Sequence, residues 1–275
     1  MSKMGDDYVI SEIERNHIQF LLEQKKRSDG RKLNEFRKIT IETDYVQKAE
    51  GSAVVSIGKT KIIAGIKAIL GNPFPDTPDS GVITTSAELS PLASPYFESG
   101  PPSEDAIELA RVTDRAIRES HAIDLSKLCL IPGKLVWILF IDMYVLNDDG
   151  NLFDAATLAT MAALATTKIP KVKIVTEEPL ETEILEDCDP LKIDHYTVSV
   201  TSYKIGDYNV FDPNNREDKI SDARITFGFD EEDRVVSMQK GKFGVYAPEE
   251  IKAQVRECLN VSKTLRKELM KAIPN

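Results

Sequence analysis

The sequence predicts an α+β fold made of two layered halves. Two strand-rich regions flank a central part that alternates helix, strand and helix, and an amphipathic helix closes the chain. Of the 275 residues, 41% are apolar and 29% charged, which is typical of a globular protein with a buried core. The length suits one large domain or two similar halves.

The first part of the chain is predicted to form a helix and then several strands. Residues 7–26 have helical apolar spacing and end in a basic turn before Ser28-Asp29-Gly30; the apolar side comprises Val9, Ile13, Ile18 and Leu21–Leu22. Alternating or β-branched runs predict strands at 39–46, 53–57, 61–69 and 82–89. The prolines of residues 72–78 predict a loop.

The central part is predicted to alternate helix, strand and helix. Ser103 can cap a helix over 104–122, because its side chain can accept from a free backbone N–H of the first turn. Residues 134–146 are almost continuously apolar, which favours a strand buried on both faces. The alanine-rich run 155–167 predicts a helix that packs closely against a sheet or a second helix.

The second half is predicted to form a loop, a second cluster of strands and a final helix. Residues 173–192 are acidic and contain Pro179 and Pro190, so we interpret them as a loop with short strand pieces. Strands are expected at 196–203, 208–211, 223–229 and 235–239, and an amphipathic helix at 249–272.

Charge and cysteine content restrict the function. Acidic residues outnumber basic ones by 45 to 35, giving a net charge of -10, whereas free-standing nucleic-acid binders are usually basic. Any RNA contact is therefore expected to be a local basic stripe or a site completed by a partner. The three cysteines lack metal-ligand spacing, and no signal peptide or membrane span is evident, so we expect reduced thiols and the cytoplasm.

The helix predicted over 104–122 carries an arginine stripe. At 100° per residue, Arg111, Arg115 and Arg118 fall together, opposite the apolar side of Leu109, Val112 and Ala116. Three guanidinium groups on one surface match phosphate oxygens. A solvated face with ion pairs to Glu108, Asp114 and Glu119 explains the same pattern, and periodicity alone favours it.

Two acidic segments are weaker candidates for chemistry. Asp212, Asp218 and Asp222 follow the strand predicted at 208–211 and could bind Mg²⁺ or donate a proton, although Asp212-Pro213-Asn214-Asn215 also suits a polar turn. Asn147–Asn151 precedes a helix, but its acidic neighbours, including Asp154, favour a turn with a cap over an anion site. No Walker A, dinucleotide, HExxH or Gly-x-Ser-x-Gly motif is present.

Five segments, spread over nearly the whole chain, carry a resemblance to a known family. They are RSDGRKLNEFR (27–37), AEGSAVVSIGKTKIIAGIKA (49–68), GPPSEDAIELARVTDRAIRES (100–120), PGKLVWILFIDMYVLNDDGNLFDAATLA (132–159) and FDPNNREDKISDARI (211–225). With them the chain resembles the RNase PH family and, within it, the non-catalytic RNase-PH-like subunits of archaeal exosomes.

The resemblance implies a fold and an assembly. The fold is the RNase PH fold, with two βαβα-like halves similar to domain 2 of ribosomal protein S5. The expected organisation is an N-terminal helix or extension (1–27), a first RNase-PH-like domain (28–190) and a second one (191–275). The implied partners are a catalytic RNase-PH-like subunit in a hetero-hexameric ring (a trimer of heterodimers), RNA-binding cap subunits and single-stranded RNA.

The departures from the family pattern suggest a non-catalytic subunit. Catalytic members carry a Gly-Gly-Thr/Ser-Arg type loop that holds the attacking phosphate, whereas this chain has Asp149-Gly150-Asn151-Leu152-Phe153-Asp154. Acids at Asp149 and Asp154 are expected to repel a phosphate dianion. The spacing of the two catalytic aspartates is kept in Asp212 and Asp218, which we interpret as a vestigial acidic pair.

The resemblance also changes the interpretation of the arginine stripe. Arg111 and Arg115 match positions that contact the RNA backbone, and Arg118 is a further candidate. No catalytic residue, cofactor or metal is expected, and no membrane contact. The expected function is to structure the partner's active site and bind RNA during 3′–5′ phosphorolysis. The alternatives are an autonomous, divergent phosphorolytic 3′–5′ exoribonuclease, supported only by Asp212 and Asp218, and a small-molecule kinase, which the missing glycine-rich loop disfavours.

Overall fold

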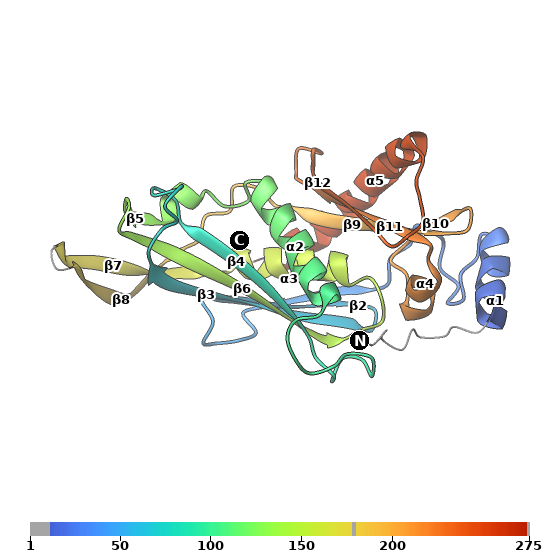
Figure 1. Cartoon of the computed structure of the whole chain (residues 1–275), viewed down its shortest axis with the longest axis horizontal. Helices are drawn as coiled ribbons and strands as arrows, with labels where there is room; N and C mark the ends of the chain where they lie inside the picture. The colour runs from blue at the N-terminus through green and yellow to red at the C-terminus, as the bar shows by residue number, and fades with distance from the viewer. Residues whose placement is uncertain (1–11, 178–179, 274–275) are drawn as a thin grey trace, which may run out of the picture.

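The computed structural model describes residues 12–177 and 180–273 and confirms the predicted α+β fold (Figure 1). Within these residues, a six-stranded and a four-stranded sheet pack against a layer of helices, and a two-stranded hairpin projects from one end. None of the described helices is both long and apolar enough to cross a membrane.

The larger sheet belongs to the first half of the chain. Its strands are β1 (Ile39–Thr43), β2 (Gly51–Ile57), β3 (Thr60–Gly71), β4 (Val82–Leu89), β5 (Cys129–Ile131) and β6 (Leu135–Asn147), in the order β1-β2-β3-β6-β4, with β5 also paired to β6. All pairs are antiparallel except β4 with β6. That parallel pair needs a long crossover, which α2 (Glu104–Glu119) and the 3₁₀ helix η1 (Leu125–Leu128) provide.

The smaller sheet belongs to the second half and is entirely antiparallel. Its strands are β9 (Val198–Ile205), β10 (Tyr208–Phe211), β11 (Ala223–Phe229) and β12 (Val235–Gly241), in the order β10-β9-β11-β12. A short helix, α4 (Asn215–Ile220), links β10 to β11, and α5 (Pro248–Ala272) packs against β9, β11 and β1.

Helix α3 (Leu152–Ala165) lies between the two sheets, in contact with β2 and β3 on one side and β9 on the other. Every residue from Phe153 to Leu164 is buried. A helix that is apolar all round can only be stable in the interior, and its many alanines permit the close approach that the sequence predicts. The two halves thereby share one continuous hydrophobic core.

The N-terminal helix α1 (Glu12–Glu23) packs on the smaller sheet. Ile18 and Leu22 are buried in a separate cluster that includes Tyr203 and Ile205. Ile13, which the sequence places on the apolar side, is instead 81% exposed. The predicted start of this helix at residue 7, and Val9, lie outside the described residues.

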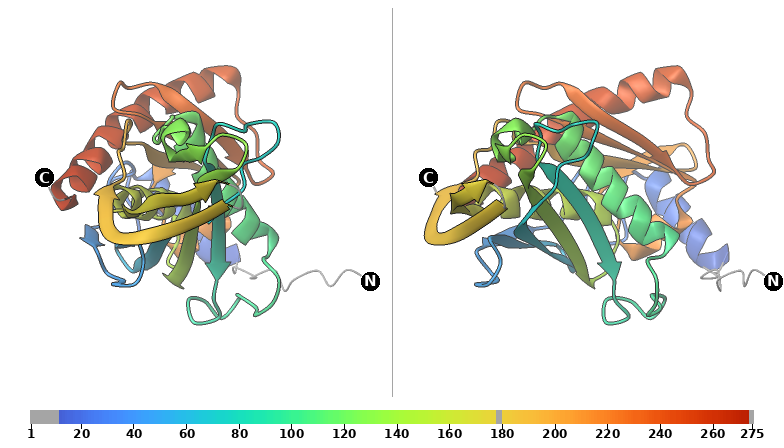
Figure 2. Two further views of the ribbon diagram at one scale, coloured as in Figure 1. Left: turned by 90° about the vertical axis from the view of Figure 1, so that its left-hand side faces the viewer. Right: turned by 60° about the vertical axis from the view of Figure 1, so that its left-hand side comes forward.

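Two predictions about strands are wrong. Residues 173–192 do not form a loop: β7 (Lys168–Glu177) and β8 (Leu180–Pro190) make a long antiparallel hairpin that projects from the body (Figures 1 and 2). Strand β6 is also not buried on both faces. Its alternate side chains Ile138 and Phe140 are only partly buried, and Tyr144 is 45% exposed, because the helices cover only one face of the larger sheet.

Candidate functional site

Helix α2 forms because its first turn is capped and its apolar spacing is helical. The Ser103 side chain accepts a hydrogen bond from Ala106 N at 3.2 Å, and Glu104 and Asp105 suit the positive end of the helix dipole. The predicted apolar side is confirmed: Leu109, Val112 and Ala116 are buried against neighbouring elements. This packing fixes the orientation of the opposite side of the helix.

The three arginines of the stripe line one groove between α2 and β4, with a volume of about 350 Å³. We call this the arginine groove; its wall also includes Ile83, Thr84 and Thr85 of β4. Arg111 and Arg118 are exposed, and Arg115 is partly buried. The structure therefore brings Arg111, Arg115 and Arg118 together on a concave surface, where a convex solvated face would have spread them apart.

The three arginines differ in the hydrogen bonds that their guanidinium groups make. Arg118 donates to both carboxylate oxygens of Asp114, at 3.0 and 2.8 Å, and to the Ile83 carbonyl oxygen at 3.1 Å. Arg115 donates to the uncharged Gln239 side chain at 2.9 Å. Among the described residues, Arg111 has no hydrogen bond or ion pair.

The acidic residues of α2 therefore do not neutralise the whole stripe. Glu108 pairs with Arg224 of β11, which also stacks on the Phe153 ring at 4.2 Å. Asp114 pairs with Arg118, as the solvated-face interpretation expects for that one pair. Within residues 12–177 and 180–273, Arg111 and Arg115 form no ion pair, although Asp114 and Glu119 also line the groove.

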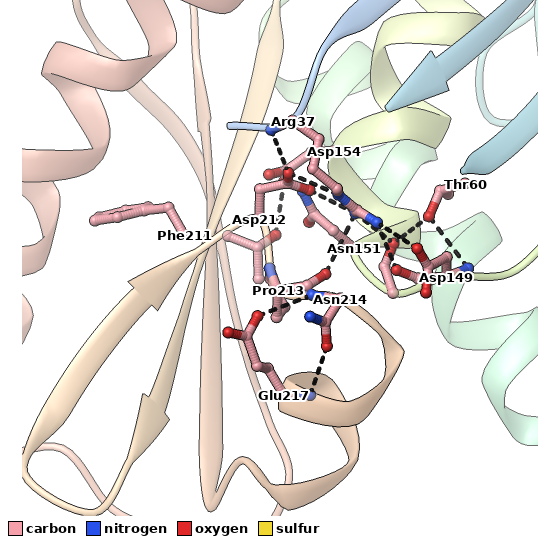
Figure 3. A network of polar contacts seen from close by, with 12 residues as sticks. Arg37, Thr60, Asp149, Asn151, Asp154, Phe211, Asp212, Pro213, Asn214 and Glu217 are labelled. Carbon is pink, nitrogen blue, oxygen red and sulfur yellow. Dashed lines mark hydrogen bonds and ion pairs between the residues drawn. The ribbon is translucent and has the colours of Figure 1, made fainter. Parts of the chain in front are cut away.

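A second polar centre surrounds Asp212, whose side chain is fully buried at the end of β10 (Figure 3). Its Oδ1 accepts from Arg37 Nη2 at 2.7 Å and Asn151 Nδ2 at 2.9 Å. Its Oδ2 accepts from Arg37 Nε and Arg31 Nη1, each at 2.9 Å. Burial alone would raise the pKa of Asp212, but the hydrogen bonds and charge of Arg37 outweigh it and lower the pKa.

A buried ion pair between Arg27 and Glu217 lies next to this centre. Arg27 and Glu217 are both without solvent exposure at their side chains, and Arg27 Nε donates to Glu217 Oε1 at 2.9 Å. Arg27 also donates to the carbonyl oxygens of Phe211, at 2.8 Å, and Asp212, at 2.9 Å. Three arginines that precede β1 thus hold the turn between β10 and α4; they are Arg27, Arg31 and Arg37.

The segment 149–154, which the resemblance matches to a phosphate loop, makes its polar contacts with the chain's own side chains (Figure 3). Arg37 Nη1 donates to the Asp149 carbonyl oxygen at 2.7 Å and to its carboxylate at 3.2 Å. Thr60 Oγ1 donates to the Gly150 carbonyl oxygen at 2.6 Å. Asn151 and Asp154 are fully buried, so the segment offers no open anion site.

The expectation that bare acids at Asp149 and Asp154 repel phosphate is therefore corrected. Asp149 is paired with Arg37. Asp154 accepts a hydrogen bond from Thr201 Oγ1 at 2.7 Å. Burial raises the pKa of Asp154 to about 7, so this side chain is not a permanent negative charge at the surface. The groups of this segment that could contact an anion are thus already bonded to Arg37, Thr60 and Thr201.

Asp218 belongs to a different set of contacts from Asp212. It lies in α4, where its Oδ1 accepts from Lys242 Nζ at 2.9 Å. Both Asp212 oxygens are held by arginines, so a metal ion would have to displace Arg37 to reach them. The six-residue spacing is kept, but among the described residues no group of three or more carboxylate, histidine or cysteine side chains is placed to hold a metal.

Sequence reasoning missed the arginines of this second centre and the helix α4. Arg37 and Asp212 are 175 positions apart, and nothing in the chain's periodicity links them. A signal for α4 is present in the sequence: Asn214 and Glu217 have the spacing of a capping box, and the structure shows both of its hydrogen bonds. The composition of this segment predicts only a polar turn, because six residues are too few to show an apolar period.

Comparison with known proteins shows two matching family models. The model described as 3′ exoribonuclease family, domain 1, matches residues 35–170, and the model for domain 2 matches residues 195–263. The chain is 47% identical over 270 residues to the exosome complex component Rrp42 of Thermococcus kodakarensis, covering 98% of this chain and 99% of that protein.

Two solved structures contain similar chains. A chain of the Archaeoglobus fulgidus exosome with RNA bound to the active site superposes with a TM-score of 0.86 at 43% identity, covering 94% of this chain and 98% of the other. A chain of an archaeal exosome core gives a TM-score of 0.82 at 39% identity, covering 94% and 97%.

Proposed function

The chain belongs to the RNase PH family of 3′ exoribonucleases and has the fold of that family, and from this premise we propose that it is a non-catalytic, RNA-contacting exosome component. The similar protein of T. kodakarensis carries the name of an exosome component, and the similar A. fulgidus chain comes from an exosome with RNA bound. The chain would pair with a catalytic RNase-PH-like subunit and help to structure its active site.

The observation that carries this proposal is that Arg111 and Arg115 line the groove without forming an ion pair among the described residues. Guanidinium groups bind phosphate oxygens through charge-assisted hydrogen bonds and need no particular base. A groove of this kind suits the backbone of single-stranded RNA during 3′–5′ phosphorolysis by the partner. Arg118, already paired with Asp114, is a weaker contributor.

The second polar centre supports a non-catalytic role. Arg37 lies beside the segment 149–154, which the resemblance matches to the phosphate loop of catalytic relatives, and its guanidinium group binds Asp149 and Asp212. With its charge neutralised by two carboxylates, Arg37 has little attraction left for an anion. We infer that this region keeps the two halves of the chain together and performs no chemistry.

The proposed assembly follows the family. The chain would alternate with the catalytic subunit in a hetero-hexameric ring, a trimer of heterodimers, with RNA-binding cap subunits on one face. A division into residues 1–27, 28–190 and 191–275, and a location in the cytoplasm, also remain proposals. The net charge of -10 supports an arrangement in which the partner subunits supply much of the positive charge along the RNA path.

The test is charge reversal in the arginine groove. We expect the double variant Arg111→Glu, Arg115→Glu, assembled with the catalytic partner, to bind a short oligoadenylate more weakly, because two attractive phosphate interactions become repulsive. Titrations at several salt concentrations should also show a flatter dependence of log K on log salt, by about 0.7 for each phosphate that is no longer neutralised. Fluorescence anisotropy in phosphate-free buffer measures both.

A matched control makes the same charge change outside the groove. Arg216 in α4 and Arg256 in α5 are exposed, and the double variant Arg216→Glu, Arg256→Glu changes the net charge by the same amount. We expect it to keep nearly the wild-type affinity. Equal reductions of affinity in both double variants would mean that only overall charge matters, and unchanged affinity in both would refute the proposal.

A further inference from the structure

The arginine groove continues into a second cavity at the carboxyl-terminal end of α2. This cavity, of about 650 Å³, shares Ile83 and Arg118 with the arginine groove. Three isoleucines that line it are almost inaccessible to solvent: Ile83 is 6% exposed, Ile117 1% and Ile123 6%. The hollow at the end of α2 is therefore lined by buried apolar side chains. Of the three isoleucines, only Ile83 also lines the arginine groove.

His121 lies at this hollow, just beyond the end of α2. The helix ends at Glu119, so helical spacing does not extend to residue 121, but His121 lines the same hollow as Arg118. It is exposed in a left-handed conformation, with a φ of 52°. Within the described part of the chain, its side chain has no hydrogen bond or ion pair, which leaves the imidazole ring available for a ligand.

The charges around the hollow disfavour phosphate. Asp124 and Asp194 line it, and both are already paired with Lys127, at 3.0 and 3.7 Å. The last turn of α2 directs the negative end of its dipole toward the same region. An anion would meet carboxylates and the last carbonyl groups of the helix, whereas a flat apolar ring with N–H donors would find partners.

We propose that the hollow at the end of α2 binds one nucleobase of the RNA whose phosphates lie on Arg111 and Arg115, with the His121 ring stacked against that base. This inference rests on the proposed function, because it takes the RNA backbone to lie in the arginine groove. Single-stranded RNA is commonly held in this way, with phosphates on cationic side chains and unstacked bases turned onto aromatic or apolar surfaces.

The test compares the wild type and a variant of His121 in their binding to RNA oligonucleotides that lack single bases. The complex with the catalytic partner is titrated, without phosphate or Mg²⁺, with oligoadenylates that each lack the base at one position. We expect one position at which base removal lowers wild-type affinity about tenfold, the usual range for one stacked base. His121→Asn, which removes the ring and tolerates the left-handed conformation, should weaken binding of the intact RNA by a similar factor. In that variant, removing the base at the same position should cause no further reduction.

The control is His17→Asn, the same substitution at an exposed histidine of α1, which should behave like the wild type with every oligonucleotide. If His121→Asn is as sensitive as the wild type to base removal at every position, the base site is refuted. That failure is distinct from failure of the proposed function. The charge-reversed Arg111 and Arg115 variant would still bind more weakly if only the base site is wrong, and would bind normally if the RNA path itself is wrong.

Discussion

At the residue scale, the consequential group is Asp212. It is a fully buried carboxylate at a left-handed position, φ 46°, and it is surrounded by guanidinium groups from a segment far away in sequence. A buried charge is tolerated only when it is paired and hydrogen-bonded. The hydrogen bonds of Asp212 therefore connect β10 to the segment that precedes β1.

Replacing this carboxylate should cost much more stability than replacing Asp218. We expect Asp212→Asn to lower the free energy of unfolding by about 3 kcal/mol, because it leaves buried guanidinium charge uncompensated. Asp218→Asn, which removes one partly exposed ion pair with Lys242, should cost about 1 kcal/mol or less. Urea unfolding of the isolated chain measures both.

The same experiment at lower pH gives a second check. The pKa of Asp212 is lowered below its ordinary value of 3.8, so its stabilising contribution is complete above that value and is lost as the pH falls through the folded-state pKa. The difference between wild type and Asp212→Asn should shrink in that range. Equal effects of the two substitutions at neutral pH would contradict the assignment.

Some of these residues could be predicted and others could not. The shared side of Arg111, Arg115 and Arg118 follows from helical geometry alone, because α2 is long and its buried side is unambiguous. The ion pairs of Arg27 with Glu217 and of Arg37 with Asp212 join segments more than 170 positions apart, and no local pattern encodes such a contact. The raised pKa of Asp154 depends on burial, which cannot be known from the sequence before the packing is known.

At the element scale, the position of α3 depends on close approach to β2. A Cβ atom on Gly51 would lie 2.2 Å from Thr167 Oγ1 and 2.4 Å from the Ala163 carbonyl oxygen. Both atoms belong to the end of α3 and the residues directly after it. Gly65 in β3 lies on the uncovered face of the sheet, and a Cβ there would have no neighbour within 4 Å.

These two glycines give a matched prediction. We expect Gly51→Ala to lower the melting temperature and to destabilise the chain by about 2 kcal/mol, because a packed helix end must move. Gly65→Ala should be neutral or slightly stabilising, because it fills no occupied space and lowers the entropy of the unfolded chain. Thermal unfolding compares them directly. A neutral Gly51→Ala would show that α3 shifts freely over the sheet.

Elements with a buried side were predictable, and elements without one were not. Strands β4, β10 and β11 begin and end where the sequence predicts, because each has β-branched or aromatic residues on a covered face. The hairpin β7–β8 was missed because its described side chains are largely exposed and β8 is acidic, which resembles a loop in composition. Strand β6 is apolar on both sides, although only one side is covered within this chain.

At the scale of the whole molecule, the question is whether the chain degrades RNA alone. Its Asp212 and Asp218 keep the spacing of a catalytic pair, but Arg37 and Lys242 bind them. Because these carboxylates are already paired, and Arg37 also binds Asp149, we expect no release of ADP from oligoadenylate by the isolated chain, even with phosphate and Mg²⁺.

Addition of the catalytic homologue should produce ADP, and the Arg111→Glu, Arg115→Glu variant should reduce that activity. Quantification of ADP over time measures both reactions. Phosphorolysis by the chain alone, abolished in Asp218→Ala, would instead support the autonomous exoribonuclease and overturn the non-catalytic assignment.

The hairpin β7–β8 has a consequence for how assembly can be observed. Among the described residues, its two strands pair only with each other, and the hairpin projects from the body (Figure 2). Ile174, Val175 and Ile184 are exposed along it. A two-stranded sheet is marginally stable in water, so its backbone amides should exchange hydrogen for deuterium quickly in the isolated chain. Any partner that covers the hairpin would slow this exchange. The exchange rate of the hairpin amides, measured by mass spectrometry, therefore reports whether a partner has bound there.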